Sequence, residues 1–363
     1  MTAVLSRQTL NRALLARQLL LRRADMPVYE AVAHLYGLQA QAPNPPYLAL
    51  WNRLAGFDPA ALSQLITDRR VVRISLMRST IHLVTAEDCL ALRPVLQPMH
   101  DRGLAAGYAK QLPGLDLDHV AAYGRELVEQ QPRTFAELRT LLAERFPGHD
   151  AEALAPVVRT RVPLVQVPPR GLWGSGGQAA HTSAEAWLSA ALPEPDPAAM
   201  VLRYLAAYGP ASVPDVQAWS GLTRLKEVVQ RLRPQLVTFR DERGVELFDL
   251  PDAPRPGADV PAPLRLLGEF DSVLLSYADR SRIISDDGRK RVFTVNGIIK
   301  ATVLADGFVA GTWRVERTRA RAVLTVQPFT ELTDAQRAEL VEEGMRLLPF
   351  VAPDAQAYDV DPG

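Results

Sequence analysis

The order of secondary-structure signals is clearest in residues 197–248, which read PAAMVLRYLAAYGPASVPDVQAWSGLTRLKEVVQRLRPQLVTFRDERGVELF. Helix-type periodicity, capping residues and turn residues alternate along this stretch. The expected elements are, in order, a helix at Pro197–Tyr208, a short helix opened by Ser212-Val-Pro-Asp215, a helix at Arg224–Leu232 capped by Thr223, and a hairpin at Leu236–Phe248 that turns at Asp241–Gly244. Three helices followed by a two-stranded wing is the order of a winged-helix unit.

The same order appears twice more toward the N-terminus. The second block predicts helices at His119–Gln130, at Phe135–Phe146 after the capping box Thr134-Phe-Ala-Glu137, and at Ala151–Arg161, with a short hairpin and wing-like loop in Leu164–Trp173. The first block is a looser version, with helices at Gln8–Arg23, Val28–Gly37, Pro45–Leu54 and Pro59–Asp68 and a hairpin of Val71–Ser75 and Thr80–Val84. Repetition at roughly 80-residue spacing predicts tandem winged-helix units.

A Pro-rich stretch at residues 251–263 separates these blocks from a strand-rich region. That region predicts a basic hairpin of Ser281–Ser285 and Arg289–Val295 around Asp286-Asp287-Gly288, a second hairpin around Asp306-Gly307, and a last helix at Thr333–Leu348. We expect an α+β fold, mainly α, divided into unit 1 at residues 1–110, unit 2 at 111–190, unit 3 at 191–255, and a strand-rich segment at 256–363 with the basic hairpin and the final helix.

Composition is typical of a globular protein with no bulk attraction for polyanions. The 363 residues include 41 Lys plus Arg and 41 Asp plus Glu, although an equal sum can hide charged patches. Cys89 is the only cysteine, which excludes an intrachain disulfide and indicates a reducing compartment. The N-terminal residues contain neither a membrane-length apolar run nor a signal-peptide pattern, so we expect a cytoplasmic protein.

Several common catalytic patterns are missing from the sequence. The histidines have no HExxH or HxH spacing, and Gly174-Ser-Gly-Gly177 lacks the lysine of a phosphate loop, so we expect neither a metal nor a nucleotide cofactor. No GxSxG elbow precedes a helix, and Cys89 has no evident histidine partner. Metal-dependent, nucleotide-hydrolysing and acyl-transfer enzymes are therefore disfavoured.

The most unusual segment is Tyr36-Gly-Leu-Gln39-Ala-Gln41-Ala-Pro43-Asn-Pro-Pro46. Pro43 disfavours helical geometry at the residue before it, so the chain is expected to leave its helix near Gly37. On extended backbone, amides at positions i and i+2 share a face, whereas on a helix they diverge. Gln39 and Gln41 are therefore candidates for one polar site; alternatively, they cap helix ends in a Pro-rich connection.

Motifs spread over most of the chain resemble the AlkZ and YcaQ type of winged-helix DNA glycosylase. The matching segments are Gln39-Ala-Gln41, Met77–Val84 (MRSTIHLV), Pro168–Gly174 (PPRGLWG), Phe270–Ser281 (FDSVLLSYADRS) and Asp306–Arg314 (DGFVAGTWR). The resemblance implies a C-shaped clamp of three tandem winged-helix motifs that binds double-stranded DNA on its concave, basic surface. It also implies that Gln39 and Gln41 are catalytic. Their Gln-x-Gln pattern resembles the branch associated with bulky lesions and self-resistance to DNA-crosslinking natural products.

Neutral amides suit a leaving group that is already activated. An N7-alkylated guanine carries a positive charge, so its departure does not require the general acid of ordinary glycoside hydrolysis. Two amide oxygens can orient a water below C1′ and face the developing positive charge of the sugar. An unmodified base remains a poor leaving group at such a site.

Basic side chains in two regions are candidates for phosphate contacts. Near the first hairpin they are Arg69, Arg70, Arg73 and Arg78, which could alternatively form a solvated surface. Around the expected basic hairpin they are Arg280, Arg282, Arg289, Lys290 and Arg291. Thr80 and His82, from the Thr-Ile-His motif, are expected to support the site. Trp173 and Trp313 are expected to pack in the wing and sheet.

The sequence predicts a monofunctional DNA glycosylase, acting as a monomer, that hydrolyses the N-glycosidic bond of N7-alkylpurines and unhooks interstrand crosslinks. Two other classes remain open. A winged-helix transcription regulator would bind duplex DNA without releasing a base, and a protein-interaction scaffold would have no salt-dependent DNA affinity.

Overall fold

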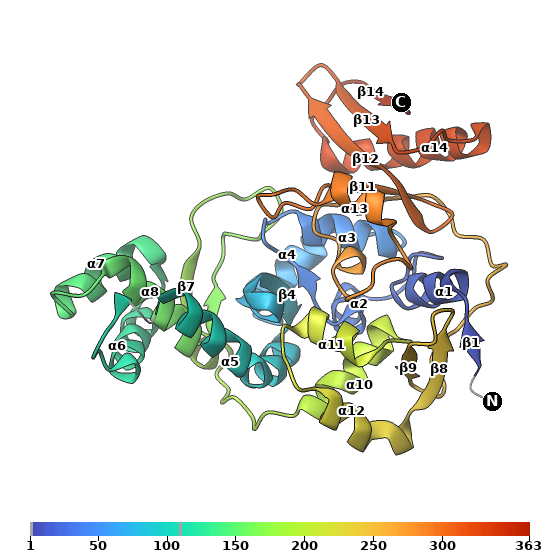
Figure 1. The fold of residues 1–363 in the computed structure, drawn as a ribbon. Coiled ribbons are helices and arrows are strands. Elements are labelled where there is room, and N and C mark those ends of the chain that lie inside the picture. The colour runs from blue at the N-terminus through green and yellow to red at the C-terminus, as the bar shows by residue number, and fades with distance from the viewer. Residues whose placement is uncertain (1–2, 109–110) are drawn as a thin grey trace.

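The computed structural model describes residues 3–108 and 111–363, in which helices pack against three β-sheets (Figure 1). The six-stranded sheet contains, in spatial order, β2 (Leu38–Gln39), β4 (Ile81–Thr85), β3 (Val71–Ser75), β6 (Leu164–Gln166), β7 (Ala180–Ser183) and β5 (Arg133–Thr134). The three-stranded sheet contains β1 (Val4–Leu5), β8 (Val237–Asp241) and β9 (Glu246–Asp249). The five-stranded sheet contains β10 (Arg265–Leu267), β11 (Thr302–Ala305), β12 (Phe308–Arg317), β13 (Ala322–Pro328) and β14 (Tyr358–Asp361). The fold is mixed α+β.

The first block has the expected helices and hairpin. Its helices are α1 (Arg7–Arg17), α2 (Val28–Leu35), α3 (Pro45–Arg53), α4 (Pro59–Thr67) and the long α5 (Ala86–Tyr108). The antiparallel strands β3 and β4 form the predicted hairpin, with the short helix η1 (Met77–Ser79) between them. α1 is shorter than expected, because the chain turns through a left-handed conformation at Leu19 (φ 56°).

The second block contains α6 (Leu117–Gln130), α7 (Phe135–Arg145), α8 (Ala151–Arg161) and α9 (Ala184–Leu188). Thr134 and Glu137 form the predicted capping box at the start of α7. The expectation that the hairpin lies within Leu164–Trp173 is wrong, because the strand that returns to β6 is β7, after a loop over residues 167–179. β6 also pairs with β3, so a continuous sheet joins the first and second blocks.

The third block matches the predicted order of helices and wing. It contains α10 (Pro197–Tyr208), α11 (Val213–Ser220), α12 (Lys226–Leu232) and the short helix η3 (Arg233–Gln235) before the β8–β9 hairpin. The N-terminal segment belongs to this part of the structure, since β1 pairs in parallel with β8. Arg17 of α1 also forms a buried ion pair with Asp249 of β9, with Nη1 2.7 Å from Oδ1.

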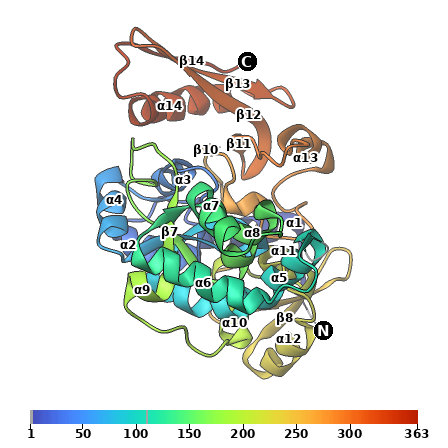
Figure 2. The same ribbon diagram turned by 90° about the vertical axis from the view of Figure 1, so that its left-hand side faces the viewer.

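The C-terminal sheet and α14 (Asp334–Val351) lie together above the rest of the molecule in Figures 1 and 2. β11 and β12 form the predicted hairpin around Asp306-Gly307, and η4 (Ser272–Leu274) follows β10. The basic hairpin expected at residues 281–295 is wrong, because Asp286–Val292 forms the helix α13. Ser285 caps this helix by accepting from the Gly288 N–H. Acidic residues in its first turn and basic ones in its last complement the helix dipole.

One large apolar core joins the first and third expected units to the strand-rich segment, and it contains Leu14 of α1, Val72 of β3, Tyr204 of α10 and Ile283 before α13. The helices α6, α7 and α8 of the second unit enclose a separate core. The division after residues 110, 190 and 255 and the winged-helix assignment of each unit remain predictions, and Lys110, at the first boundary, lies outside the described residues.

Candidate active site

The Gln-x-Gln segment leaves α2 through a glycine that other residues would replace only with strain. α2 ends at Tyr36 (φ 54°), and Gly37 follows with φ 101°. A Cβ on Gly37 would lie 3.1 Å from Val84 Cγ1 and 3.3 Å from Met77 Cε, so conformation and space both favour glycine. β2 then runs antiparallel to β4, which confirms the prediction that the chain leaves its helix near Gly37 and becomes extended.

The two glutamines have different surroundings. Gln39 is 7% exposed and lies opposite His82 in the sheet, and its Oε1 accepts a hydrogen bond from Arg78 Nη2 at 3.0 Å. Gln41 is exposed, and its Oε1 accepts from the Ile81 backbone N–H at 3.2 Å. A carbonyl oxygen has two lone pairs, so each amide retains one with which it can accept a hydrogen bond from water.

Arg78 is held in a strained turn and bonds within the protein. It adopts φ 56° and ψ 22° in η1, and the next residue, Ser79, has φ 58°. Its Nη1 donates to the Trp219 carbonyl at 2.5 Å while its Nη2 reaches Gln39. Burial lowers the pKa of Arg78 to about 10, which leaves the guanidinium charged at neutral pH. Contact of Arg78 with phosphate remains a prediction, and in this structure each of its terminal nitrogens already donates to a protein acceptor.

His82 and Thr80 pack around the same turn. Burial, followed by the charge of Arg78, lowers the pKa of His82 to about 3. The ring is therefore neutral at pH 7, and His82 Nδ1 donates to the Thr80 carbonyl at 3.0 Å. Thr80 Oγ1 donates to the Met77 carbonyl at 3.0 Å. These contacts suit the supporting role expected for both residues.

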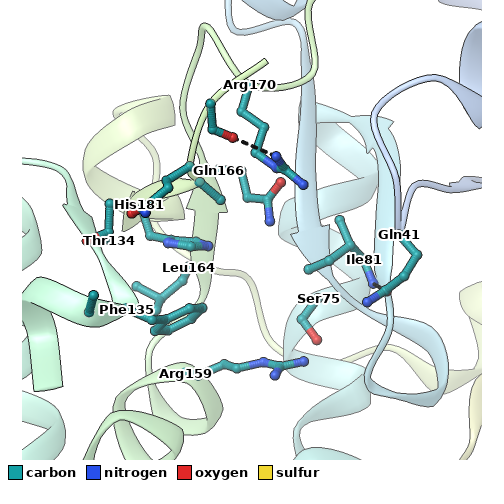
Figure 3. Close-up of a pocket in the computed structure, with 14 residues that line it drawn as sticks. Gln41, Ser75, Ile81, Thr134, Phe135, Arg159, Leu164, Gln166, Arg170 and His181 are labelled. Carbon is teal, nitrogen blue, oxygen red and sulfur yellow. Dashed lines mark hydrogen bonds between the residues drawn. The ribbon is translucent and has the colours of Figure 1, made fainter. Parts of the chain in front are cut away.

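A cavity of about 470 Å³ lies beside Gln41, between the first and second blocks (Figure 3). Arg159 of α8 and Arg170 of the 167–179 loop line it from the second block. Arg159 Nη2 donates to the Ser79 carbonyl at 3.2 Å, and Arg170 Nη1 donates to the Gly177 carbonyl at 2.6 Å. The described residues that line this cavity include no carboxylate.

The two cavity-lining arginines, Arg159 and Arg170, are not among the residues predicted to contact DNA. Arg170 lies within the quoted Pro-Pro-Arg-Gly motif, which was the sequence signal for it, and Arg159 lies in the last turn of the third helix of its block. His181 lines the same cavity, and burial lowers its pKa to about 4. The second block therefore supplies a large part of this surface.

Arg73 and Arg282 are buried, which contradicts the expectation that they contact DNA. Arg73 is 1% exposed and donates from Nη2 to the Ala40 carbonyl at 2.8 Å. Arg282 is 5% exposed and donates from Nη1 to the Pro210 carbonyl at 2.7 Å. Neither guanidinium can reach a phosphate without first leaving its protein partners.

Arg69 and Arg70 lie at the opposite end of β3 from the cavity. Ser75 lines the cavity, whereas Val71 begins the strand just after these arginines, and a strand rises about 3.3 Å per residue. The guanidinium of Arg69 stacks over Trp187, and that of Arg70 over Tyr29. Their contact with DNA remains a prediction, but the structure does not bring them to the glutamines.

The cations around Gly288 lie on and before α13. Arg289 and Lys290 are exposed, whereas Arg291 pairs with Asp287 at 3.0 Å and Arg280 stacks over the Phe293 ring. Of this group, Arg289 and Lys290 remain the best candidates for phosphate contacts.

A tight turn occurs further along the chain, at Asn296-Gly297. Phe293 and Ile299 form an antiparallel bridge, and Val295 at the tip is fully exposed. The Asn-Gly pair was the sequence signal for this turn.

Comparison with known proteins identifies the family. A family model described as "DNA glycosylase AlkZ-like" matches residues 32–350. The chain belongs to this family and is a DNA glycosylase, whose substrate is DNA. A transcription regulator or a scaffold is therefore not favoured.

One curated relative is the interstrand DNA cross-link repair glycosylase of Streptomyces sahachiroi. It is 27% identical over 351 residues, covering 89% of this chain and 91% of the relative. The solved structure of Streptomyces sahachiroi DNA glycosylase AlkZ has a TM-score of 0.77 over 99% of both chains at 22% identity. The two proteins share a fold over nearly their whole length.

Within residues 3–108 and 111–363, no helix combines the length and apolar character needed to cross a membrane.

Proposed function

We propose that this glycosylase hydrolyses the N-glycosidic bond of N7-alkylpurines and unhooks interstrand crosslinks, with Gln39 and Gln41 as its catalytic residues. The observation that carries the proposal is a cavity lined by Gln41, two residues from the buried Gln39, whose described lining has no carboxylate. A site without an acid suits a base that is already cationic and leaves without protonation. It discriminates against normal bases, which leave slowly from the same site.

Each glutamine has a distinct place in the proposed reaction. The free lone pair of each Oε1 accepts a hydrogen bond from the attacking water and faces the positive charge that develops on the sugar. As the C1′–N bond breaks and the C1′–O bond forms, the alkylated base leaves neutral and the proton lost by the water passes to solvent. The hydrogen bonds from Arg78 and the Ile81 N–H fix the two amides before DNA binds. Preorganisation of this kind lowers the barrier because no reorganisation is needed during the reaction. His82 and Thr80 support the turn that carries Arg78.

The cations around the cavity hold the DNA backbone. Arg159 and Arg170 face the cavity in which Gln41 lies, and Arg289 and Lys290 are exposed on α13. Phosphate contacts supply affinity and register but no sequence preference. The protein binds as a monomer, and the units of residues 1–110, 111–190 and 191–255 together form the clamp.

The crosslink substrate is supported by the relative from Streptomyces sahachiroi, whose name specifies interstrand cross-link repair. The Gln-x-Gln pattern adds a biological role, self-resistance to a DNA-alkylating natural product. Expression in a sensitive bacterium should then raise survival after a bifunctional alkylating agent, and Gln39→Ala should abolish the protection.

The decisive experiment is single-turnover release of N7-methylguanine, and of a crosslinked N7-alkylguanine, from duplex DNA. We expect Gln39→Ala and Gln41→Ala to slow release by about 100-fold or more while DNA affinity changes by less than about threefold. Gln41→Asp tests whether a carboxylate can replace the second amide. Gln178→Ala is the matched control, because Gln178 also lines the cavity but lies outside the motif. A wild-type protein that binds both duplexes and releases neither base would refute the proposal.

A further inference from the structure

The hydrogen-bond ladder between β2 and β4 is interrupted beside the catalytic segment. The Ala40 N–H donates to the Ile81 carbonyl at 2.7 Å. In a regular antiparallel pair, the Ile81 N–H would donate back to the Ala40 carbonyl. It donates instead to Oε1 of Gln41. The Gln41 side chain thus occupies a backbone donor that a complete ladder would use.

Arg73 replaces the missing backbone donor. Ala40 is fully buried, so its carbonyl requires a hydrogen-bond partner. Nη2 of Arg73 supplies one at 2.8 Å, reaching across the sheet from β3, which is separated from β2 by β4. Nε of the same guanidinium donates to Gln166 Oε1 of β6 at 3.1 Å. A single side chain therefore links the catalytic segment to the second block.

Burial of the Arg73 guanidinium has a free-energy cost, because a charge is removed from water. In the part of the chain that the structure describes, Arg73 forms no ion pair, and its Nη1 has no hydrogen-bond partner. Gly171, with φ 98°, leaves room for it, since a Cβ there would lie 2.5 Å from Arg73 Cδ. An apolar side chain in this position would avoid the penalty of burying a charge. Arg73 therefore has a role that an apolar side chain could not fill.

We propose that Arg73 is a positioning residue for Gln41, an inference that rests on the proposed function of the glutamines. By holding the Ala40 carbonyl, Arg73 leaves the Ile81 N–H free to fix the Gln41 amide. Without the guanidinium, the ladder closes: the Ile81 N–H returns to the Ala40 carbonyl, and Gln41 loses its anchor.

A double-mutant cycle tests this coupling. We expect Arg73→Met to slow single-turnover base release by about tenfold or more in the wild-type background, and by less than about twofold in a Gln41→Ala background. DNA affinity should stay within about threefold of wild type. Equal slowing in both backgrounds would overturn the proposal, because it would mean that Arg73 acts independently of Gln41.

Two further variants serve as controls. Gln166 also lines the cavity, so Gln166→Met, which leaves the Ala40 contact of Arg73, should change base release by the same factor in the wild-type and Gln41→Ala backgrounds. Arg93→Met removes a different buried guanidinium, which donates to the Thr160 carbonyl, and reports the general cost of such a loss. Arg73→Lys should recover part of the rate, because an ammonium can also donate to the Ala40 carbonyl. Arg73→Gln is the second probe if Arg73→Met does not fold.

A measurement independent of activity separates this proposal from the proposed function. The chain has seven isoleucines, so ¹⁵N-isoleucine labelling gives a simple amide spectrum in which Ile81 can be assigned with Ile81→Val. Arg73→Met should move the Ile81 amide signal as Gln41→Ala does, since both free this N–H from the Gln41 amide. An Ile81 signal that moves only in Gln41→Ala would overturn the inference. If the wild-type protein releases no base, the proposed function is refuted, whereas the contact between Gln41 and the Ile81 N–H that Arg73 maintains is judged by the Ile81 signal.

Discussion

At the scale of single residues, the positive charge of Arg78 alone does not distinguish a residue that positions Gln39 from one that contacts a DNA phosphate. Its guanidinium bridges the Trp219 carbonyl and Gln39 Oε1. A lysine cannot span both acceptors, because its ammonium is a single point on a flexible stem. Arg78→Lys should therefore slow base release by about tenfold with little loss of DNA affinity. The measurement is single-turnover kinetics beside DNA titrations at several salt concentrations, with Arg69→Lys, on an exposed arginine, as control.

The opposite result would have a clear meaning. If Arg78 contacted a phosphate, its replacement would weaken binding on every sequence and reduce the salt dependence by about one counterion. Loss of affinity with an unchanged rate constant would therefore support the phosphate role and reject the positioning one.

His82 gives the protein a specific pH dependence of stability. Its pKa is lowered to about 3 in the folded state, whereas the unfolded side chain titrates near its ordinary value of 6.5. Between these values the unfolded state binds more protons, so stability falls as the pH drops below about 6.5. From pH 7 to pH 5 this one group should cost about 2 kcal/mol of unfolding free energy.

Urea unfolding of wild type and His82→Gln at both pH values measures that contribution. The variant should be less stable at pH 7 but should lose less stability on acidification. His100 and His181, whose pKa values burial also lowers, remain in both proteins and provide the common background. Equal losses in the two proteins would show that His82 takes up its proton in the folded state.

At the scale of elements, close helix packing depends on a glycine in α6. A Cβ on Gly124 would overlap the side chain of Val158 in α8. Gly124→Ala should therefore destabilise the protein by about 1–3 kcal/mol, despite the better helix propensity of alanine. Gly103→Ala is the matched control, because Gly103 lies in α5 with no atom near its Cβ position, and it should be neutral or slightly stabilising. Stabilisation by both substitutions in thermal unfolding would show that α6 and α8 can separate at no cost.

Local sequence patterns predict some elements correctly and others incorrectly. The capping boxes at Thr134 and Ser212 lie where local sequence predicts them, because a cap depends on residues three positions apart. The expected basic hairpin was wrong for a related reason: Asp286-Asp287-Gly288 is a good turn, but the same residues after Ser285 also form a good first helical turn. In the helical conformation, Val292 at the end of α13 packs into the large apolar core.

At the scale of the whole molecule, a buried ion pair joins the first block to the C-terminal region. Arg53 of α3 donates to both carboxylate oxygens of Asp271 at 2.8 Å, and both side chains are almost fully buried. Arg53→Met leaves the carboxylate uncompensated and should cost about 3–5 kcal/mol in urea unfolding. Arg139→Met, in an exposed pair with Glu152, should cost less than about 1 kcal/mol. Similar small losses in both variants would mean that Arg53 and Asp271 do not hold the two regions together.

Local sequence determined most of the helices, the β3–β4 hairpin and the extended Gln-x-Gln segment, because helix caps, glycines and prolines act within a few residues. It also carried the motifs by which the family is recognised. Tertiary structure alone decided that β6 pairs with β3, that β1 joins β8, and that Arg73 is buried against Ala40 rather than exposed to DNA. Strand pairing and burial join residues far apart in the chain, so no local pattern distinguishes an arginine that binds phosphate from one that holds a backbone carbonyl.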